Sequence, residues 1–308
     1  GINLCKFILK NLENNIIIID DQNNNSLPDF NDLLIKYPDR IIFLNINICN
    51  LDIKYFNNLL KTYNISEIKY IFHLACNASP KIYQKNPFHT LDTCYIGTKN
   101  ILEVAKIFGS RIVYSSTSEI YGNPTVSKQN EDYFGNVNPI GDRSCYDEGK
   151  RIGETLCYEY SKLNVNVGIV RIFNTYGPHM KIDDGRVISN FIIQNLNKEK
   201  ITIYGNGTQT RSFCYIDDLI NGLIKFINID HFGPINLGND NEMTILNLAN
   251  KIQNITKIKS EITFLNLPQD DPIIRNPVLN KAKKILDWEP KINIEEGLKK
   301  TIEYFSNL

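Results

Sequence analysis

The feature that most constrains the fold is the alternation of short apolar runs with longer helical patterns over residues 16–172. Strand-length runs separated by helix-length segments are typical of repeated β-α-β units, which build a parallel sheet covered by helices. The sequence therefore predicts the α/β class with a doubly wound parallel sheet. The clearest helices are expected at 86–108 and 145–163. We expect strands at residues 16–19, 41–45, 70–74, 111–115 and 165–172.

The pattern changes after Arg171, where loops rich in Gly, Pro and Asn, short strands and two later helices replace the regular alternation. This change predicts a smaller α/β lobe that covers the carboxyl ends of the strands, where such sheets bind ligands. The first domain is expected over 1–174, with a return segment at about 213–240. The smaller lobe is expected over 175–212 and 241–308.

The start of the chain departs from the usual order of a dinucleotide-binding fold, which is strand, glycine-rich turn, helix, strand and then an acidic residue. Here Gly1 leads directly into the helical pattern INLCKFILKNL, and the next strand ends at Asp20. We therefore expect the sequence to start at the last glycine of that turn, within a longer protein. A fold that never had the first strand is the alternative. The asparagine-rich stretch 21–25 is expected to be a loop.

Composition excludes several classes of function. Lys plus Arg and Asp plus Glu both number 34, so no net charge favours nucleic acid or an anionic membrane. The seven cysteines lack metal-ligand spacing, which indicates reduced thiols and no metal site. No run reaches the roughly 20 apolar residues of a membrane span, and no signal peptide is visible. We expect a cytoplasmic protein, with an anchor upstream of Gly1 as an open alternative.

Residues 115–150 contain a set of side chains suited to proton transfer. The string SSTSEIYG ends an expected strand and supplies the hydroxyls of Thr117 and Ser118 and the carboxylate of Glu119. The string SCYDEGK places Tyr146 and Lys150 four residues apart, on one face of a helix. A nearby ammonium group and a cationic nicotinamide ring would both lower the pKa of the tyrosine. Tyr146 would then accept a proton from a sugar hydroxyl while a hydride leaves the same carbon.

The same spacing of tyrosine and lysine occurs at two other places, Tyr95 with Lys99 and Tyr158 with Lys162. The spacing alone is therefore weak evidence. The hydroxyl and carboxylate groups that precede Tyr146 by one strand-to-helix crossover favour this pair, because neither of the others has such neighbours.

Eight motifs carry a resemblance to a known family, and they run in order along the chain: HLACNASPKIYQKNP, STSEIYG, GNVNPIGDRSCYDEGKRIGET, RIFNTYGP, DDGRVISNF, YGNGTQTRSFCYIDDL, INLGN and DDPIIRNPVLNKAKKILDWEP. With them the chain resembles the extended short-chain dehydrogenase/reductases that act on nucleotide sugars, and within these the UDP-glucuronate decarboxylases (UDP-xylose synthases). The resemblance implies a Rossmann-like fold, NAD as cofactor and a UDP-sugar substrate. It also implies a homodimer formed by the helices at 92–108 and 146–163.

The resemblance implies decarboxylation of UDP-glucuronate to UDP-xylose, in which Thr117 binds the reacting oxygen, Tyr146 is the base and Lys150 supports it. Related 4,6-dehydratases carry an Asp at the position of Ser118, which is not a strong acid and so disfavours loss of water. Ser118 and Glu119 are candidates for protonating C5. The product is either UDP-xylose or a 4-keto pentose that is released before the hydride returns. A 4-epimerase, a 4,6-dehydratase and a non-catalytic nucleotide-sugar-binding protein are the alternative functions.

Further positions are carried over from the family motifs. The candidates for binding NAD, besides Tyr146 and Lys150, are Gly1, Asp20 and Asn47, and a carboxylate at Asp20 would favour NAD over NADP. Guanidinium groups suit a diphosphate, amides suit the sugar and a tyrosine ring suits uracil. The candidates for binding the UDP-sugar are Tyr83, Asn174, Arg186, Asn190, Tyr204, Arg211 and Arg275.

Overall fold

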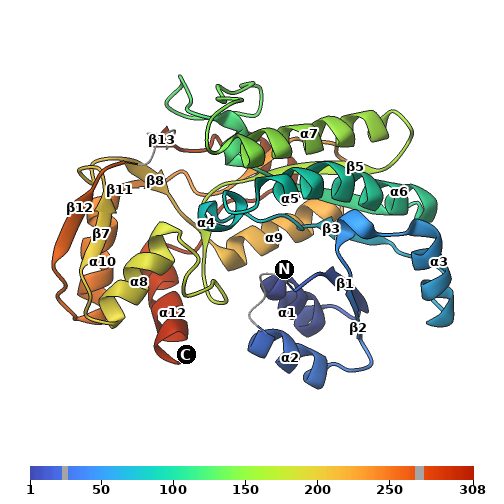
Figure 1. Ribbon diagram of the computed structural model, residues 1–308, viewed down its shortest axis with the longest axis horizontal. Coiled ribbons are helices and arrows are strands. Elements are labelled where there is room, and N and C mark those ends of the chain that lie inside the picture. The colour runs from blue at the N-terminus through green and yellow to red at the C-terminus, as the bar shows by residue number, and fades with distance from the viewer. Residues whose placement is uncertain (23–26, 268–273) are drawn as a thin grey trace.

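The strands expected in the first half of the chain form within a few residues of their expected bounds in the computed structural model, which describes residues 1–22, 27–267 and 274–308 (Figure 1). They pair in parallel throughout. One sheet has the order β10-β5-β4-β3 and a second pairs β1 with β2. These strands are β1 (Ile16–Asp20), β2 (Ile41–Asn45), β3 (Tyr70–His73), β4 (Arg111–Thr117), β5 (Val167–Ile172) and β10 (Ile235–Leu237).

Strands β1 and β3 each pair with one strand among the described residues. Strand β1 pairs with β2, and β3 pairs with β4. The loop expected at 21–25 lies largely outside the described residues.

The helices expected at 86–108 and 145–163 are confirmed. The first consists of α5, a π-helical turn at Thr93–Gly97 and α6, and the second is α7. The remaining short turns are η1 (Ile48–Asn50) and η3 (Ser118–Tyr121). The helices of this part are α1 (Ile2–Asn11), α2 (Leu27–Lys36), α3 (Ile53–Thr62), α4 (Pro80–Tyr83), α5 (Pro87–Asp92), α6 (Thr98–Phe108), α7 (Ser144–Ser161), α9 (Ile216–Ile227) and α11 (Asn280–Leu286).

Helices cover both faces of the larger sheet (Figure 1). Successive side chains of a strand point to opposite faces. Ile112 and Tyr114 of β4 therefore pack in the core beneath α6 and α7, whereas Val113 packs in a second core with α9 and α11. Both faces of β4 are buried. This explains why residues 112–114 are all apolar and do not alternate with polar residues.

The second part of the molecule, at the left of Figure 1, has its own core around Ile192, Leu248 and Leu298. Its helices are α8 (Val187–Leu196), α10 (Ile245–Thr256) and α12 (Ile294–Ser306). Its strands are β6 (Thr175–Tyr176), β7 (Ile201–Tyr204), β8 (Thr210–Ser212), β9 (Cys214–Tyr215), β11 (Glu242–Thr244), β12 (Ile262–Leu265) and β13 (Ile274–Arg275). Among the helices that the structure describes, none is long and apolar enough to cross a lipid bilayer.

Candidate active site

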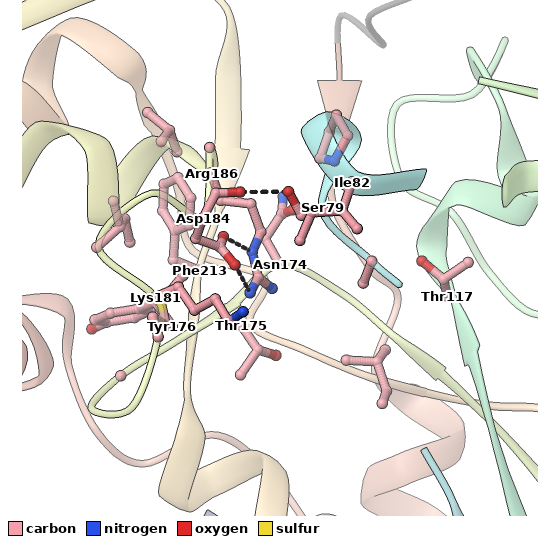
Figure 2. Close-up of a pocket in the computed structure, with 18 of the residues that line it drawn as sticks. Ser79, Ile82, Thr117, Asn174, Thr175, Tyr176, Lys181, Asp184, Arg186 and Phe213 are labelled. Carbon is pink, nitrogen blue, oxygen red and sulfur yellow. Dashed lines mark hydrogen bonds and ion pairs between the residues drawn. The ribbon is translucent and has the colours of Figure 1, made fainter. Parts of the chain in front are cut away.

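A cavity of about 1120 Å³ lies between the two parts of the molecule. One wall comes from the carboxyl end of β4, the segment after β3 and the start of α7, and the other from loops around β6 and β8 and from α8. Figure 2 shows Thr117 on one side of this space and Asp184 and Arg186 on the other, with Ser79 beside Asp184. The cavity therefore lies beyond the carboxyl end of the sheet, where open α/β folds bind ligands.

Thr117, Ser118 and Glu119 all line the cavity. Strand β4 ends at Thr117, and the chain turns there into η3. The Thr117 hydroxyl accepts a hydrogen bond from the backbone N–H of Glu119 at 3.2 Å, as a helix-capping residue does. This cap fixes the three side chains at the end of the strand, as the sequence predicted.

Tyr146 and Lys150 lie on α7 and line the same cavity. The Lys150 ammonium donates a hydrogen bond to the carbonyl of Ser115 at 2.7 Å and lies 6.0 Å from the centre of the Tyr146 ring. Tyr83 stacks on Tyr146, with ring centres 4.9 Å apart and ring planes 8° apart. These contacts hold the phenol ring against the cavity wall.

Gly153 allows α7 to lie close to β4. A Cβ atom at this position would be 2.0 Å from the hydroxyl oxygen of Tyr114, which is on β4. Any larger residue would push the helix away from the strand. The absence of a side chain at Gly153 thus sets the distance between Tyr146 and the residues that follow β4.

The pKa of Tyr146 was expected to fall beside Lys150 and a cationic nicotinamide ring, and the chain by itself has the opposite effect. Burial raises the pKa of Tyr146 well above its ordinary value, and the nearby Cys76 and Glu119 raise it further. A hydrogen bond with Thr117 opposes this rise but does not outweigh it. Tyr146 is therefore a neutral phenol that can donate a proton, and it becomes a base only when added positive charge offsets its burial.

Glu119 lies between two arginines. Its Oε2 forms ion pairs with Arg143 Nη2 and with Arg275 Nη2, the latter at 3.1 Å. Burial alone would raise the pKa of Glu119, but the charges of Arg275 and Arg143 outweigh burial and lower it to about 2. Glu119 is a carboxylate at neutral pH.

Arg275 is placed differently from the expectation that it faces a diphosphate. It is 1% exposed and donates to the carbonyl of Gly122 at 2.8 Å as well as to Glu119. It is absent from the described lining of the large cavity and lines a smaller one. Arg143 was not predicted as a site residue, although its position at the start of the same helix as Tyr146 was a usable signal.

The other candidates for binding a sugar nucleotide all line the large cavity, namely Tyr83, Asn174, Arg186, Asn190, Tyr204 and Arg211. Arg186 forms a two-point ion pair with Asp184, with Nη2 2.8 Å from Oδ1. The carbonyl of Asp184 accepts a hydrogen bond from the Ser79 hydroxyl at 2.5 Å, which ties the two walls together (Figure 2). Both Asp184 and Ser79 lie within the family motifs, but neither was predicted as a site residue.

The candidates for binding a dinucleotide lie near the amino end of the chain. Gly1 precedes α1 and lines the large cavity, and a Cβ atom there would meet nothing within 4 Å. Asp20 ends β1, and Asn47 lies two residues beyond β2 and caps η1. Both are outside the lining of the large cavity, but they follow adjacent parallel strands. An open helix start and a carboxylate at a strand end suit a pyrophosphate and a ribose.

The two other Tyr-Lys pairs lie outside the cavity lining. Tyr95 is 45% exposed and Tyr158 is 52% exposed. The ammonium of Lys162 lies over the Tyr158 ring and pairs with Glu159 on the surface. Only the pair at Tyr146 has the hydroxyl and carboxylate neighbours that its sequence context indicated.

The parallel sheets, the cavity at their carboxyl end and the buried tyrosine and lysine define a Rossmann-like α/β fold of the short-chain dehydrogenase/reductase class. Residues 1–238 match the NAD dependent epimerase/dehydratase family. The chain belongs to this family, as its motifs indicated.

Within this family, the chain is similar to proteins that are named UDP-glucuronic acid decarboxylases. The chain is 54% identical over 241 residues to UDP-glucuronic acid decarboxylase 1 of Danio rerio, covering 78% of this chain and 58% of that protein. It is 52% identical over 233 residues to UDP-glucuronic acid decarboxylase 6 of Arabidopsis thaliana, covering 75% of this chain and 68% of that protein. The chain thus spans less than two thirds of the first of these relatives.

Solved structures confirm the fold. The UDP-glucuronic acid 4-epimerase of Bacillus cereus, in complex with UDP-glucuronic acid and NAD, superposes with a TM-score of 0.86 at 26% identity, covering 100% of this chain and 96% of that one. UDP-glucose 4-epimerase of Thermotoga maritima superposes with a TM-score of 0.88 at 24% identity, covering 100% and 95%.

Proposed function

We propose that this protein is an NAD-dependent decarboxylase that converts UDP-glucuronate to UDP-xylose. The observation that carries the proposal is that one cavity brings Thr117, Ser118, Glu119, Tyr146 and Lys150 together with two arginines of the opposite wall, Arg186 and Arg211. Relatives that are 50–54% identical are named UDP-glucuronic acid decarboxylases, which supports this substrate and this reaction.

Bound NAD would accept a hydride from C4 of the sugar and later return it. Tyr146 and Thr117 share a hydrogen bond, and the C4 hydroxyl would take its place between them. Tyr146 would remove the hydroxyl proton, because the positive charges of Lys150 and of the oxidised ring together offset the burial that keeps the phenol neutral. Lys150 is buried and oriented by Ser115, so its charge acts at a fixed place.

Loss of carbon dioxide follows from the chemistry of the oxidised sugar. A ketone at C4 makes the C6 carboxylate that of a β-keto acid, so the electron pair left on C5 spreads onto the C4 oxygen. Tyr146 and Thr117 are placed to stabilise that oxygen as negative charge develops on it. Ser118 is 2% exposed and brings no acidic proton, which disfavours loss of a hydroxyl group.

The residues that line the two walls of the large cavity can be assigned to parts of the substrate. We assign Arg211 to the diphosphate and Tyr204 to uracil, while Arg186, Tyr83, Asn174 and Asn190 would bind the sugar and its carboxylate. Gly1, Asp20 and Asn47 would hold the pyrophosphate, ribose and adenine of NAD. Residues 1–174 with 213–240 would then form the cofactor domain, and 175–212 with 241–308 the substrate lobe. The role of Arg275 is revised to that of a residue that holds Glu119.

A homodimer is proposed from the outer surface of α5, the π-helical turn that follows it and α7. Large apolar side chains are exposed there, with Phe88 at 78%, Tyr95 at 45% and Ile152 at 41%. Exposed apolar groups on neighbouring helices are typical of an interface between copies. The proposed location is cytoplasmic.

The test is to supply the protein with NAD and UDP-glucuronate and to measure carbon dioxide and the nucleotide-sugar product. Carbon dioxide with UDP-xylose is expected. Carbon dioxide with a released 4-keto pentose would keep the decarboxylation and change the product. UDP-galacturonate without carbon dioxide would instead show a 4-epimerase, the activity in the name of one structural neighbour. Tight binding of UDP-glucuronate with no turnover would indicate a binding protein.

A further inference from the structure

A second, smaller cavity lies beside Glu119. Its volume is about 250 Å³, and four charged side chains line it: Glu119, Arg143, Asp147 and Arg275. Three asparagines, Asn123, Asn136 and Asn138, lie at its exposed edge. A polar space of this size holds several water molecules, since one water occupies about 30 Å³.

Glu119 and Arg143 line both cavities. The ion pair between them therefore separates the proposed substrate site from the small cavity, and Glu119 faces each side. Asp147 lines the small cavity only. A proton that enters from solvent at the asparagine edge would have a polar path past Asp147 to Glu119.

Asp147 is a buried acid that the proposed reaction has not used. It is 6% exposed, and its Oδ1 has no hydrogen-bond partner within residues 1–22, 27–267 and 274–308. Its Oδ2 is 3.9 Å from Arg143 Nε, too far for a hydrogen bond. A buried carboxyl oxygen without a protein partner calls for water or a proton.

The charged groups around Asp147 determine its protonation. Burial is the main cause that raises its pKa, to about 7, and the negative charges of Glu119 and Glu148 add to the rise. Arg143 and Arg275 oppose it. Near neutral pH Asp147 therefore carries a proton for much of the time. Glu119 does not, because a pKa of about 2 leaves on the order of one molecule in 10⁵ protonated at pH 7.

We propose that Asp147 supplies the proton that reaches C5 of the sugar, through water in the small cavity and through Glu119. This rests on the proposed decarboxylation. After carbon dioxide leaves, Glu119 takes a proton through water from Asp147 and transfers a proton to C5, where the electron pair forms the C–H bond. The O–H bond of Asp147 breaks, and solvent returns a proton to its carboxylate. Asp147 thus acts through Glu119 and does not touch the sugar.

The test compares Asp147→Asn with Glu148→Gln. The asparagine keeps the shape of the side chain but has no acidic proton, and Glu148 pairs with Arg151 at the surface, outside both cavities. Carbon dioxide release is measured across pH, together with calorimetric binding of UDP-glucuronate. In the unsubstituted protein, kcat is expected to fall as pH rises through about 7, because the donor loses its proton.

Asp147→Asn is expected to lower kcat by about 100-fold or more and to abolish this pH dependence, with little change in substrate affinity. Glu148→Gln is expected to keep the rate at low pH and to shift the pH profile only slightly downward, because Glu148 has the smallest of the charge effects on the pKa of Asp147 described above. Asp147→Glu, which restores an acid, should recover part of the rate. An Asp147→Asn protein with normal kcat and a normal profile would overturn the relay.

Two further outcomes remain decisive. If Asp147→Asn does not fold, Asn123→Leu, which narrows the exposed edge of the small cavity, should still slow carbon dioxide release by about threefold or more if the water path is used. A normal rate in that variant would overturn the relay. If the unsubstituted protein releases no carbon dioxide, both the proposed function and the relay are refuted. If it releases carbon dioxide and Asp147→Asn does so at the same rate, only the relay is refuted.

Discussion

Helix α7 carries the same tyrosine-lysine spacing at both of its ends, and the two ends differ in every other respect. Tyr146 is 5% exposed at the cavity, whereas Tyr158 is 52% exposed at the surface. Lys150 is buried and donates to a strand carbonyl, whereas Lys162 pairs with Glu159 in solvent. Twelve residues at about 100° each place the two tyrosines roughly 120° apart around the helix. Spacing puts a tyrosine and a lysine on one face, but what that face contacts decides their chemistry.

The largest expected difference between the two ends is in catalysis. Tyr146→Phe removes the group proposed to exchange a proton with the C4 hydroxyl, and carbon dioxide release is expected to fall by about 100-fold or more. Tyr158→Phe is the matched control on the same helix and should leave the rate within about twofold. Initial rates with saturating UDP-glucuronate and NAD would measure both. A near-normal rate in Tyr146→Phe would show that Tyr146 is not the base. It would also show that the two ends of α7 do not differ in catalysis.

A second difference concerns packing against the sheet. Gly153→Ala would place a Cβ atom 2.0 Å from the Tyr114 hydroxyl, so the helix or the ring has to move. Overpacking of this kind is expected to cost about 1–3 kcal/mol of unfolding free energy. Thr155→Ala, on the exposed face two residues further along, should change it by less than about 0.5 kcal/mol. Urea unfolding measures both, and equal stability of the two variants would contradict the close helix-strand contact.

The two ends also carry acids with different environments. Burial raises the pKa of Asp147 to about 7, so the folded state holds a proton there that the unfolded chain releases near its ordinary value of 3.8. The folded state therefore loses stability as pH rises toward and through 7. Asp147→Asn is expected to raise the melting temperature by a few degrees near about pH 8.5 and to change it little near about pH 3. Glu159→Gln, at the exposed end, should show no such pH dependence. Thermal melts at several pH values would decide, and a parallel shift at every pH would show that Asp147 is not a protonated buried acid.

The sequence predicted those parts of the site that depend on neighbouring residues. The end of β4 and the start of α7 were predictable because an apolar run and a helical spacing are local patterns. The contact between Arg275 and Glu119 joins positions 156 residues apart, and no local pattern reports it. The raised pKa of Tyr146 was missed for a similar reason, since burial depends on how Tyr83 and Cys76 pack around the ring.

The exposed end of α7 gives the smallest expected effect. Lys162→Met removes an ion pair with Glu159 and an ammonium over the Tyr158 ring, but water surrounds all three groups and screens their charges. Carbon dioxide release should stay within about twofold and the melting temperature within about one degree. The same substitution at Lys150 would leave the Ser115 carbonyl without its buried donor and remove the charge beside Tyr146. If Lys162→Met lost as much activity as Lys150→Met, both ends of the helix would act in the reaction. Burial would then not distinguish the catalytic tyrosine-lysine pair from the exposed one.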